Sequence, residues 1–268
     1  RICCLCGSLL RLIFGDKNMN EFEKTSKIEG RNPVLEALKS GRRIDKIYIK
    51  KGDIQGSAKK IFALARAKKI IISEVEKQKL DMMSETKAHQ GVIAIAPVKD
   101  YASVEDILSA AKDKQKPHFI IIADRITDPH NLGAIIRTAN AAGADGVIIS
   151  KHSSATLTPV CEKSSAGAVE YTPVARVTNL VQTIKMLKNK NIWVIGADMD
   201  GENTIYTQDF SGNIAIVIGS EGDGISPLIK KSCDFLVKIP MYGNVASLNA
   251  SVAGSLMIYE AVRRRQDI

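Results

Sequence analysis

The sequence predicts an α/β protein of two domains, the second of which contains a parallel sheet covered by helices. Its 268 residues are enough for two ordinary domains, since a typical domain has about 100 to 200 residues. Helical and strand patterns alternate along the chain. The predicted strands of the second half are apolar almost throughout, which is typical of parallel strands that are buried on both faces.

Residues 1–24 are expected to be a leader and not native structure. The apolar run 9–14 is interrupted by Arg11 and is followed by no convincing small-residue cleavage site, so it does not fit a secretion signal. Met19 precedes an ordinary polar start. We therefore expect Met19 to be the native first residue and residues 1–18 to be either a translated leader or a gene-calling artefact.

Residues 25–98 are predicted to form a small α/β domain. Pro33 fits the first turn of a helix, where its missing N–H costs little, and Gly41 fits the position just after the last turn. His89 is expected to have a structural role. The predicted elements are a helix at 33–40, a strand at 46–50, a helix at 57–68 and strands at 70–73 and 91–97.

Residues 99–116 are predicted to be a linker, because they are rich in Lys, Asp, Ser and Ala. One amphipathic pattern at 104–111 predicts a short helix within it. Pro117 is expected to begin the second domain.

Residues 117–268 are predicted to form the domain with the parallel sheet. Trp193, in one of its apolar runs, is expected to be a core residue. The predicted strands lie at 119–123, 147–149, 192–195, 214–218 and 235–239, and the predicted helices at 132–142, 180–188 and 248–264.

The distribution of charge points to a polyanionic partner. Residues 1–116 carry 24 Lys and Arg against 15 Asp and Glu, whereas residues 117–268 carry 14 of each, so the whole net charge of +9 lies in the first part. Basic side chains gain affinity for phosphates by releasing condensed counterions. This favours an RNA-holding module beside a neutral chemical module; the alternative is a basic surface that serves solubility.

The cysteines and apolar runs argue against several classes of protein. Three of the five cysteines lie in the first six residues, and Cys161 and Cys233 are isolated, which fits neither a zinc site nor a disulfide framework. A reduced, cytoplasmic location is expected. No apolar run approaches the roughly 18 residues of a membrane helix, and no His, Cys or carboxylate cluster has metal-ligand spacing, so we predict neither a membrane span nor a metal.

A glycine-rich turn at 219–224 follows the fourth predicted strand of this domain. A dinucleotide-binding fold would place such a turn after its first strand, and residues 123–128 contain no glycine there. Glycines at this turn would allow the backbone to approach a ligand closely. The alternative is that they only turn a strand into a helix.

Three polar residues stand at positions where a structural role is the simplest expectation. Asn131 and Ser247 lie at predicted helix starts, where Asn and Ser are favoured N-caps. Arg137 lies in an apolar stretch, so it must reach the surface or find an acidic partner, for which we expect Glu221.

These residues belong to three motifs that occur in order over about 130 residues. The first is the segment 128–133 (DPHNLG) with Arg137, the second is 216–222 (IVIGSEG), and the third runs from 238–241 (KIPM) to 247–249 (SLN). In this order and spacing they resemble the motifs of the SpoU (TrmH-type) family of SPOUT-class RNA 2'-O-ribose methyltransferases. The resemblance implies a trefoil-knotted SPOUT domain, S-adenosyl-L-methionine as cofactor and a homodimer formed through that domain.

The resemblance also implies roles for individual residues. The catalytic set would be Asn131, Arg137, Glu221, Ser247 and Asn249. The cofactor would be bound by Gly219, Ile239, Met241 and Leu248. His130, between the first-motif Pro and Asn, is expected to be a loop residue.

The first domain indicates which subgroup of the SpoU family the chain resembles. Its segments 28–38 and 89–92 resemble the ribosomal-protein-like RNA-binding domain of the enzymes that act on large-subunit ribosomal RNA, and the subgroup that matches best is the 23S ribosomal RNA guanosine-2'-O-methyltransferases. RNA binding is expected at Arg31, Asn32, Arg42 and Arg43, extended by Lys50 and Lys51.

Alternative functions remain open from the sequence. A tRNA ribose methyltransferase and a ribosomal RNA methyltransferase that confers antibiotic resistance would share the motifs. A catalytically silent RNA-binding or ribosome-assembly protein could keep the fold, and a nicotinamide or nucleotide enzyme would require specific dinucleotide binding.

Overall fold

The computed structural model describes residues 25–52, 55–113, 116–245 and 247–265. The expected leader and Met19 lie outside these residues. The chain divides into two compact units, with the boundary between Asp100 and Tyr101. None of the helices in the described ranges is long and apolar enough to cross a membrane.

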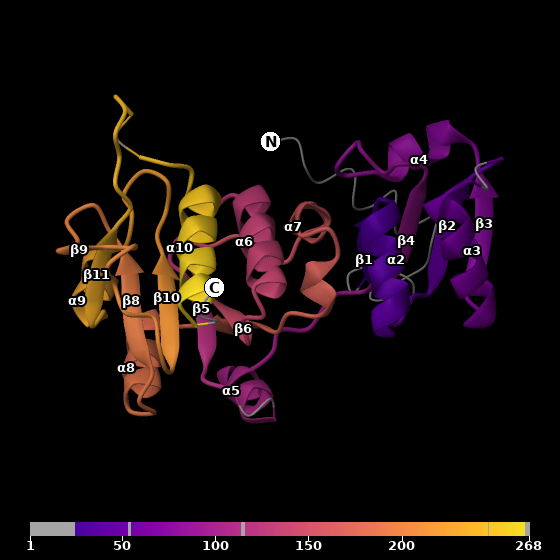
Figure 1. Ribbon diagram of the computed structural model, residues 1–268. Coiled ribbons are helices and arrows are strands. Elements are labelled where there is room, and N and C mark those ends of the chain that lie inside the picture. Colours follow the sequence, from indigo (N-terminus) through magenta and orange to yellow (C-terminus); the bar gives the residue numbers. More distant parts are fainter. Residues whose placement is uncertain (1–24, 53–54, 114–115, 246, 266–268) are drawn as a thin grey trace, which may run out of the picture. The chain divides into compact units, whose positions relative to one another are not determined.

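The first unit contains a four-stranded sheet with three helices (Figure 1). The strand order is β1-β4-β2-β3, in which β4 is antiparallel to both neighbours and β2 is parallel to β3. Apolar residues of α2 and α3 pack on the sheet in one core, which includes Leu38, Ile47 and Ile61. The elements are β1 (Thr25–Glu29), α2 (Arg31–Ser40), β2 (Lys46–Lys50), α3 (Ser57–Ala67), β3 (Ile71–Val75), α4 (Lys77–Met83) and β4 (Val92–Pro97).

Most predicted elements of this unit are confirmed. Gly41 ends α2 with a left-handed φ of 82°, as its position suggested. His89 is buried; its Nδ1 accepts a hydrogen bond from the backbone N–H of Gly91 (2.9 Å) and its Nε2 lies 2.9 Å from Asp81 Oδ1, which is a structural role. The sequence analysis missed β1 and α4.

Glu29 is a buried carboxylate that fixes the segment before β4. It is 1% exposed and accepts hydrogen bonds from Ser84 Oγ (2.6 Å), from the backbone N–H groups of Glu85 (2.6 Å) and Thr86 (3.2 Å), and from the Thr86 hydroxyl. Burial alone would raise the pKa of Glu29, but these hydrogen bonds outweigh it and hold the pKa below 4.5.

We expect Glu29→Gln to lower the free energy of unfolding by about 2–4 kcal/mol near pH 7, because an amide cannot accept all of these hydrogen bonds. The depressed pKa means that the carboxylate stabilises the fold fully above its unfolded-state pKa, and that this contribution is lost as the pH falls through the lower folded-state pKa. Urea unfolding at neutral and acidic pH measures both values. The difference between the proteins should shrink below about pH 4.5; a difference independent of pH would contradict this account.

The second unit contains a seven-stranded sheet with the order β7-β6-β5-β10-β8-β11-β9, and every pairing between its described strands is parallel. The strands are β5 (Phe119–Ala123), β6 (Gly146–Ser150), β7 (Val174–Val177), β8 (Trp193–Ala197), β9 (Asn203–Thr204), β10 (Ile214–Ile218) and β11 (Phe235–Lys238). The helices are α5 (Val104–Asp113), α6 (Pro129–Ala141), α7 (Pro159–Ser164), α8 (Leu180–Lys188), α9 (Pro227–Ser232) and α10 (Ala250–Arg265), with a short 3-10 turn η1 (Ala168–Glu170). The parallel sheet confirms the predicted fold class.

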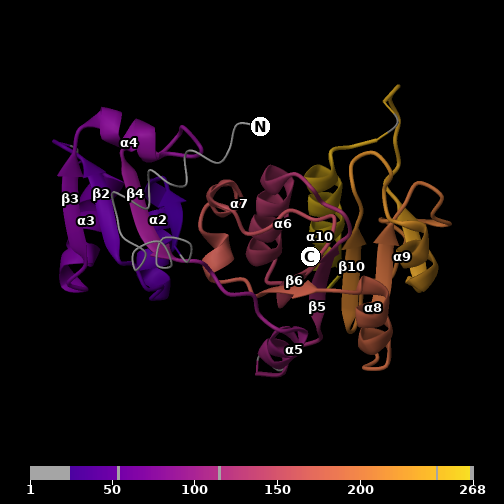
Figure 2. The same ribbon diagram turned by 180° about the vertical axis from the view of Figure 1, so that it is seen from behind.

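Two helical layers cover this sheet (Figures 1 and 2). Ile121 and Ile216 pack with α6 and α10 on one face, whereas Ile120 and Ala215, which alternate with them, pack with α5 and α8 on the other. Successive side chains of a strand point to opposite faces of the sheet. The side chains on both faces of these strands must therefore be apolar. The uninterrupted apolar runs follow from this arrangement.

The prediction of a linker at 99–116 is wrong for most of that segment. Ile107 and Leu108 of α5 are buried against the sheet of the second unit, and the backbone N–H of Ala102 donates to the Val174 carbonyl (2.9 Å). The helix was predicted, but its apolar face is part of the second core and not an isolated amphipathic surface.

Trp193 is another correction. Its side chain is 55% exposed and packs on Phe235, with ring centroids 5.6 Å apart. Trp193 is the first residue of β8, and its exposure shows that the helices do not cover the strand there. An apolar run therefore predicted the strand correctly and the burial of its first residue incorrectly.

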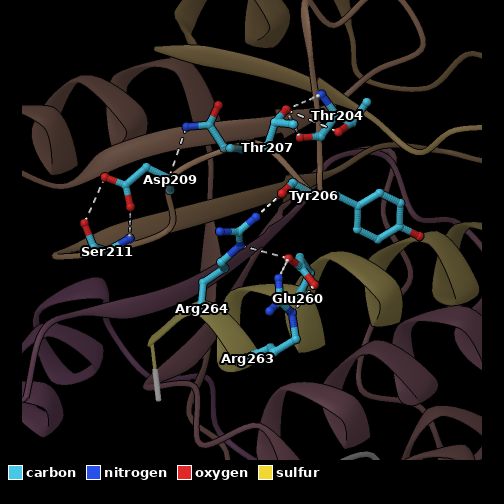
Figure 3. A network of polar contacts seen from close by, with 9 residues as sticks. Thr204, Tyr206, Thr207, Asp209, Ser211, Glu260, Arg263 and Arg264 are labelled. Carbon is cyan, nitrogen blue, oxygen red and sulfur yellow. Dashed lines mark hydrogen bonds and ion pairs between the residues drawn. The ribbon is translucent and has the colours of Figure 1, made fainter. Parts of the chain in front are cut away.

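Charged residues anchor the end of α10 (Figure 3). Glu260, which is 9% exposed, accepts hydrogen bonds from Arg263 (2.9 and 2.6 Å) and from Arg264 Nε (3.1 Å). Arg264 also donates to the Tyr206 carbonyl in the segment after β9. These contacts tie the end of the last helix to the segment after β9.

Candidate functional site

A large hollow among the described residues of the second unit lies at the carboxyl ends of its strands. The chain segments that leave β8, β10 and β11 all contribute to it, and the start of α10 completes it. Its volume is about 760 Å³. Ligands of open parallel sheets bind at this edge, because the strands end together and the loops that follow them converge.

The four residues expected to bind a cofactor all line this hollow. Gly219 follows β10, Ile239 and Met241 follow β11, and Leu248 lies just before α10. Further apolar walls come from Ile218, Ala197, Met199 and Val237. The structure therefore brings together four expected residues that are up to 29 positions apart in the sequence.

The turn at Gly219 requires glycine for a local reason. Ser220 and Gly224 exchange backbone hydrogen bonds (3.0 and 3.1 Å), and Gly224 has a φ of 63°. A Cβ on Gly219 would lie 2.1 Å from the carbonyl carbon of Gly224. The turn folds back on Gly219, so glycine is needed there even before any ligand is considered.

Asn131, Glu221 and Asn249 form a hydrogen-bonded cluster beside the hollow. Asn131 Nδ2 donates to Glu221 Oε1 (2.7 Å), and Asn249 Nδ2 donates to Asn131 Oδ1 (3.1 Å) and to Glu221 Oε1. Glu221 lines both the large hollow and a neighbouring crevice of about 150 Å³ that is also lined by Asn131. One carboxylate thus fixes two amide side chains from α6 and the start of α10.

The N-cap expected at Asn131 is formed instead by Asp128. Asp128 Oδ1 accepts a hydrogen bond from the backbone N–H of His130 (2.9 Å), and Pro129 is the first residue of α6. His130 accordingly lies in the helix and not in a loop. Asn131 is one position further along and only 7% exposed, so its amide is available to Glu221 and Asn249.

A similar correction applies to Ser247. Asn249 caps α10, because its Oδ1 accepts hydrogen bonds from the backbone N–H groups of Ser251 (3.0 Å) and Val252 (3.2 Å). Ser247 is exposed and lines the large hollow. The hydroxyl therefore lies at the rim of the hollow and not at the helix end.

Arg137 does not pair with Glu221. It follows Asn131 by six positions on α6, which turns its side chain by about 240° around the helix axis. The side chain is exposed and forms no hydrogen bond or ion pair with any described residue, whereas Glu221 is bonded to Asn131 and Asn249. Within one copy, Arg137 stands apart from the cluster.

In the first unit, the expected RNA-binding residues divide into two groups. Arg31, Asn32 and Lys50 line a polar hollow of about 630 Å³ together with Lys77 and Lys87. Arg42 instead donates to Ser26 Oγ (3.1 Å) and the Pro97 carbonyl (3.0 Å), which ties β1 to the end of β4, and Arg43 pairs with Asp45 (3.1 Å). Lys51 lies 3.8 Å from Glu76.

Comparison with known families identifies both units. The SpoU rRNA Methylase family matches residues 118–259, and the family of RNA 2'-O ribose methyltransferase substrate-binding domains matches residues 27–102. The chain belongs to the SpoU family. This SpoU protein is 44% identical over 239 residues to a TrmH family tRNA/rRNA methyltransferase of Bacillus subtilis (strain 168), covering 89% of this chain and 96% of the relative. A relative of Staphylococcus aureus (strain MSSA476), described in the same way, is 46% identical over 241 residues, covering 90% and 97%.

Solved SpoU structures agree in fold. The SpoU methyltransferase AviRb from Streptomyces viridochromogenes, in complex with AdoMet, matches with a TM-score of 0.77 and 25% identity over 95% of each chain. An AdoMet-bound rRNA methyltransferase from Sinorhizobium meliloti matches with a TM-score of 0.74 and 25% identity, over 93% of this chain and 90% of that one. A TrmH/SpoU tRNA modifying enzyme of A. aeolicus matches only 61% of this chain, with a TM-score of 0.52 and 28% identity. The SpoU protein is thus an RNA methyltransferase that uses S-adenosylmethionine.

Three charged residues that the sequence did not single out also lie at the large hollow. Asp198, Asp200 and Lys230 line the large hollow. Asp198 directly follows the last residue of β8, a position at the carboxyl end of a parallel strand that marks a candidate ligand contact. Lys230 lies in a six-residue helix that the sequence did not predict.

Proposed function

We propose that this SpoU protein methylates the 2'-hydroxyl of a ribose, that of a guanosine, in large-subunit ribosomal RNA. The observation that carries the proposal is the cluster of Asn131, Glu221 and Asn249 beside the large hollow. It places fixed polar groups next to a site with apolar walls. That combination suits a nucleoside-containing cofactor on one side and a polar reacting group on the other.

The hollow fits S-adenosylmethionine in size and chemistry. Its volume of about 760 Å³ is in the usual range for small-molecule sites. Ile239, Met241 and Leu248 would pack on the adenine, and the backbone at Gly219 would hydrogen-bond the nucleoside. When bound, the cofactor supplies a methyl group activated by a positively charged sulfur.

The polar residues would hold the acceptor nucleotide. Methyl transfer requires the methyl carbon and the 2'-oxygen in line and the hydroxyl proton removed. Glu221 keeps Asn131 and Asn249 in fixed orientations, and Ser247 at the rim would contact the ribose. We assign to Arg137 the binding of the adjacent phosphate and the stabilisation of charge that develops on the 2'-oxygen, since a guanidinium remains protonated and cannot act as the base.

A homodimer explains how an arginine that stands apart from its own cluster takes part in catalysis. Thr138, beside Arg137, lies 3.0 Å from Ser255 Oγ of α10. The adjacent face of α10 exposes Val252, Leu256 and Tyr259, and exposed apolar surface of this kind is typical of subunit interfaces. We place the homodimer contact on this face of α6 and α10, so that Arg137 acts at its edge.

The coverage of the solved neighbours favours ribosomal RNA over tRNA. The neighbour named as an rRNA methyltransferase matches 93% of this chain and therefore includes both units, whereas the tRNA modifying enzyme matches 61%. The 61% match is about the length of the second unit alone. A catalytically silent protein is disfavoured by the intact cluster.

The test is transfer of labelled methyl groups from S-adenosylmethionine to unmodified 23S, 16S and tRNA transcripts. We expect label on 23S RNA. Label on tRNA alone would support the proposed methyl-transfer reaction but refute ribosomal RNA as the substrate.

The basic hollow of the first unit is the proposed RNA contact. The ammonium groups of Lys50, Lys77 and Lys87 make no hydrogen bond or ion pair with the rest of the described chain. Asp81, which also lines the hollow, is hydrogen-bonded to His89 and has a favourable electrostatic interaction with Lys77. Cations gathered in this way repel one another until an anion binds, which suits an RNA phosphate.

We expect the double variant Lys50→Ala, Lys77→Ala to bind RNA about tenfold more weakly and to lower the slope of log K against log salt by about 1.4 to 1.8, the value for two lost phosphate contacts. The matched control is Lys59→Ala, Lys60→Ala, which removes the same charge from exposed positions of α3 outside the hollow. Filter binding over a salt series gives both slopes. Equal slopes for the two variants would refute the assignment of the hollow.

A further inference from the structure

Two walls of the large hollow are joined by a single lysine. One wall is the turn at residues 198–201, which follows β8, and the other is the segment from Gly219 through α9. Lys230 of α9 donates hydrogen bonds to Asp198 Oδ1 (2.8 Å) and Asp200 Oδ2 (2.7 Å). These contacts link segments that are about 30 residues apart in the chain.

Contacts with β11 hold the two ends of the turn, Asp198 and Gly201, whereas the side chain of Asp200 is held by Lys230. The N–H of Asp198 donates to the Val237 carbonyl (2.9 Å), and Asp198 Oδ1 accepts from the N–H of Asp200 (2.9 Å). Gly201 lies so close to β11 that a Cβ would be 2.7 Å from Val237 Cα. Asp200, in contrast, has a side chain that is 82% exposed, and among the described residues its hydrogen bonds go only to its own turn and to Lys230.

The opposite wall is rigid enough to serve as an anchor. The backbone N–H of Ser226, just before α9, donates to Asp124 Oδ2 (2.7 Å). Ile225 and Ile229 are buried in the core beneath α9. Lys230 therefore projects from a fixed helix toward a turn that is less well fixed.

The charges of the three residues make the link specific. Without Lys230, two carboxylates two residues apart would face the same hollow and repel each other. The side chains of Asp198 and Lys230 are 13% and 29% exposed, so this pair is screened less by solvent than the pair with Asp200. Hydrogen bonds to Asp198 and Asp200 raise the pKa of Lys230, and the hydrogen bond from Lys230 lowers the pKa of Asp200.

Met199 lies between the two carboxylates and lines the hollow. Holding Asp198 and Asp200 therefore also sets the position of Met199, which faces the same space as Ile239, Met241 and Leu248. We propose that Lys230 is a positioning residue that keeps the turn at 198–201 closed as one wall of the cofactor site. The proposal rests on the placement of S-adenosylmethionine in this hollow.

The test compares cofactor affinity with turnover in the full-length protein. We expect Lys230→Met to raise the Kd of S-adenosylmethionine, measured by calorimetry without RNA, about fivefold, the scale of a partly exposed ion-pair network. Turnover at saturating cofactor and RNA should stay within about twofold, because the reacting groups are not touched. Lys230→Arg should restore the affinity, since it keeps the charge and the reach.

Two further variants separate positioning from general stability. Lys231→Met removes a neighbouring exposed charge of the same helix and should leave the Kd unchanged. Asp200→Asn should raise the Kd less than Lys230→Met does. In the double variant Asp200→Asn, Lys230→Met, the Kd should rise by less than the product of the two single effects, because both substitutions remove the same contact between Lys230 and Asp200. An unchanged Kd in Lys230→Met, or an equal rise in Lys231→Met, overturns the proposal.

If S-adenosylmethionine does not bind in this hollow, the measured Kd values will show a different pattern. Leu248 lines the hollow just before α10, so Leu248→Arg tests the placement, and an unchanged Kd in that variant refutes it. If the Leu248 variant loses the cofactor while Lys230→Met retains full affinity, the placement stands and the role of Lys230 is refuted.

Discussion

Replacing Arg137 by Ala should lower methyl transfer to RNA at least about 100-fold, the usual effect of removing a group that stabilises developing charge. The Kd of S-adenosylmethionine should not change, because Arg137 does not line the hollow. The side chain is exposed and has no partner in the described chain, so its loss should not affect folding. Single-turnover methyl transfer, calorimetry and a thermal melt measure the three quantities.

Two variants make the Arg137 result specific. Arg137→Lys keeps the charge but loses the planar fork that binds a phosphate with two parallel hydrogen bonds, so we expect it to recover only part of the rate. Lys185→Ala removes one exposed charge from α8, on the opposite face of the sheet, and should retain full activity. Activity of Arg137→Ala within about threefold of the unmodified protein would rule out its proposed role.

Leu248→Arg should abolish cofactor binding. The substitution places a guanidinium in the wall of the hollow, where it would occupy space and repel a positively charged sulfur. We expect the Kd of S-adenosylmethionine to rise at least about 100-fold, which corresponds to about 2.7 kcal/mol. The readout is the thermal shift caused by the cofactor, since a ligand that binds only the folded state stabilises it by an amount set by its concentration relative to its Kd.

Val245→Arg is the matched control for Leu248→Arg. Val245 lies three residues earlier in the same segment, is exposed and does not line the hollow. It should keep the full thermal shift. Both variants should melt like the unmodified protein when no cofactor is present, and a normal thermal shift in Leu248→Arg would show that the cofactor binds elsewhere.

The parallel sheet of the second unit could be predicted because its burial leaves a direct mark on the sequence. Both faces of β5 and β10 are covered, so all their residues are apolar, and their predicted bounds match the structure. Strand β9 has two residues and α9 has six, which is too short for any periodic pattern. The helix α5 was predicted, but amphipathicity does not say which core a helix joins.

Most of the candidate site residues lie near one another in the structure, but their contacts were not predicted. The four expected cofactor residues line one hollow, and Asn131, Glu221 and Asn249 join in one cluster. The roles of Asn131 and Ser247 as caps were wrong because Asp128 and Asn249, which lie three and two residues away, cap the helices. Shifts of this size are within the usual uncertainty of predicted helix ends, but they decide which side chain caps the helix and which is available for other contacts.

Two errors arose from long-range geometry. The expected pair of Arg137 and Glu221 depends on the direction of each side chain around α6, which the motif order does not contain. Lys230 could not be selected from the sequence, because its partners Asp198 and Asp200 are brought to it only by the packing of α9 beside the sheet.

The most direct test of the account identifies the atom that receives the methyl group. Labelled methyl is transferred from S-adenosylmethionine to a 23S transcript by the unmodified protein and by Arg137→Ala, and the RNA is then hydrolysed in alkali. Alkaline cleavage requires a free 2'-hydroxyl, so a methylated ribose remains within an uncleaved dinucleotide. We predict that the label appears in such a dinucleotide with guanosine on its 5' side, and only with the unmodified protein; label in mononucleotides would show methylation of a base and would contradict the account.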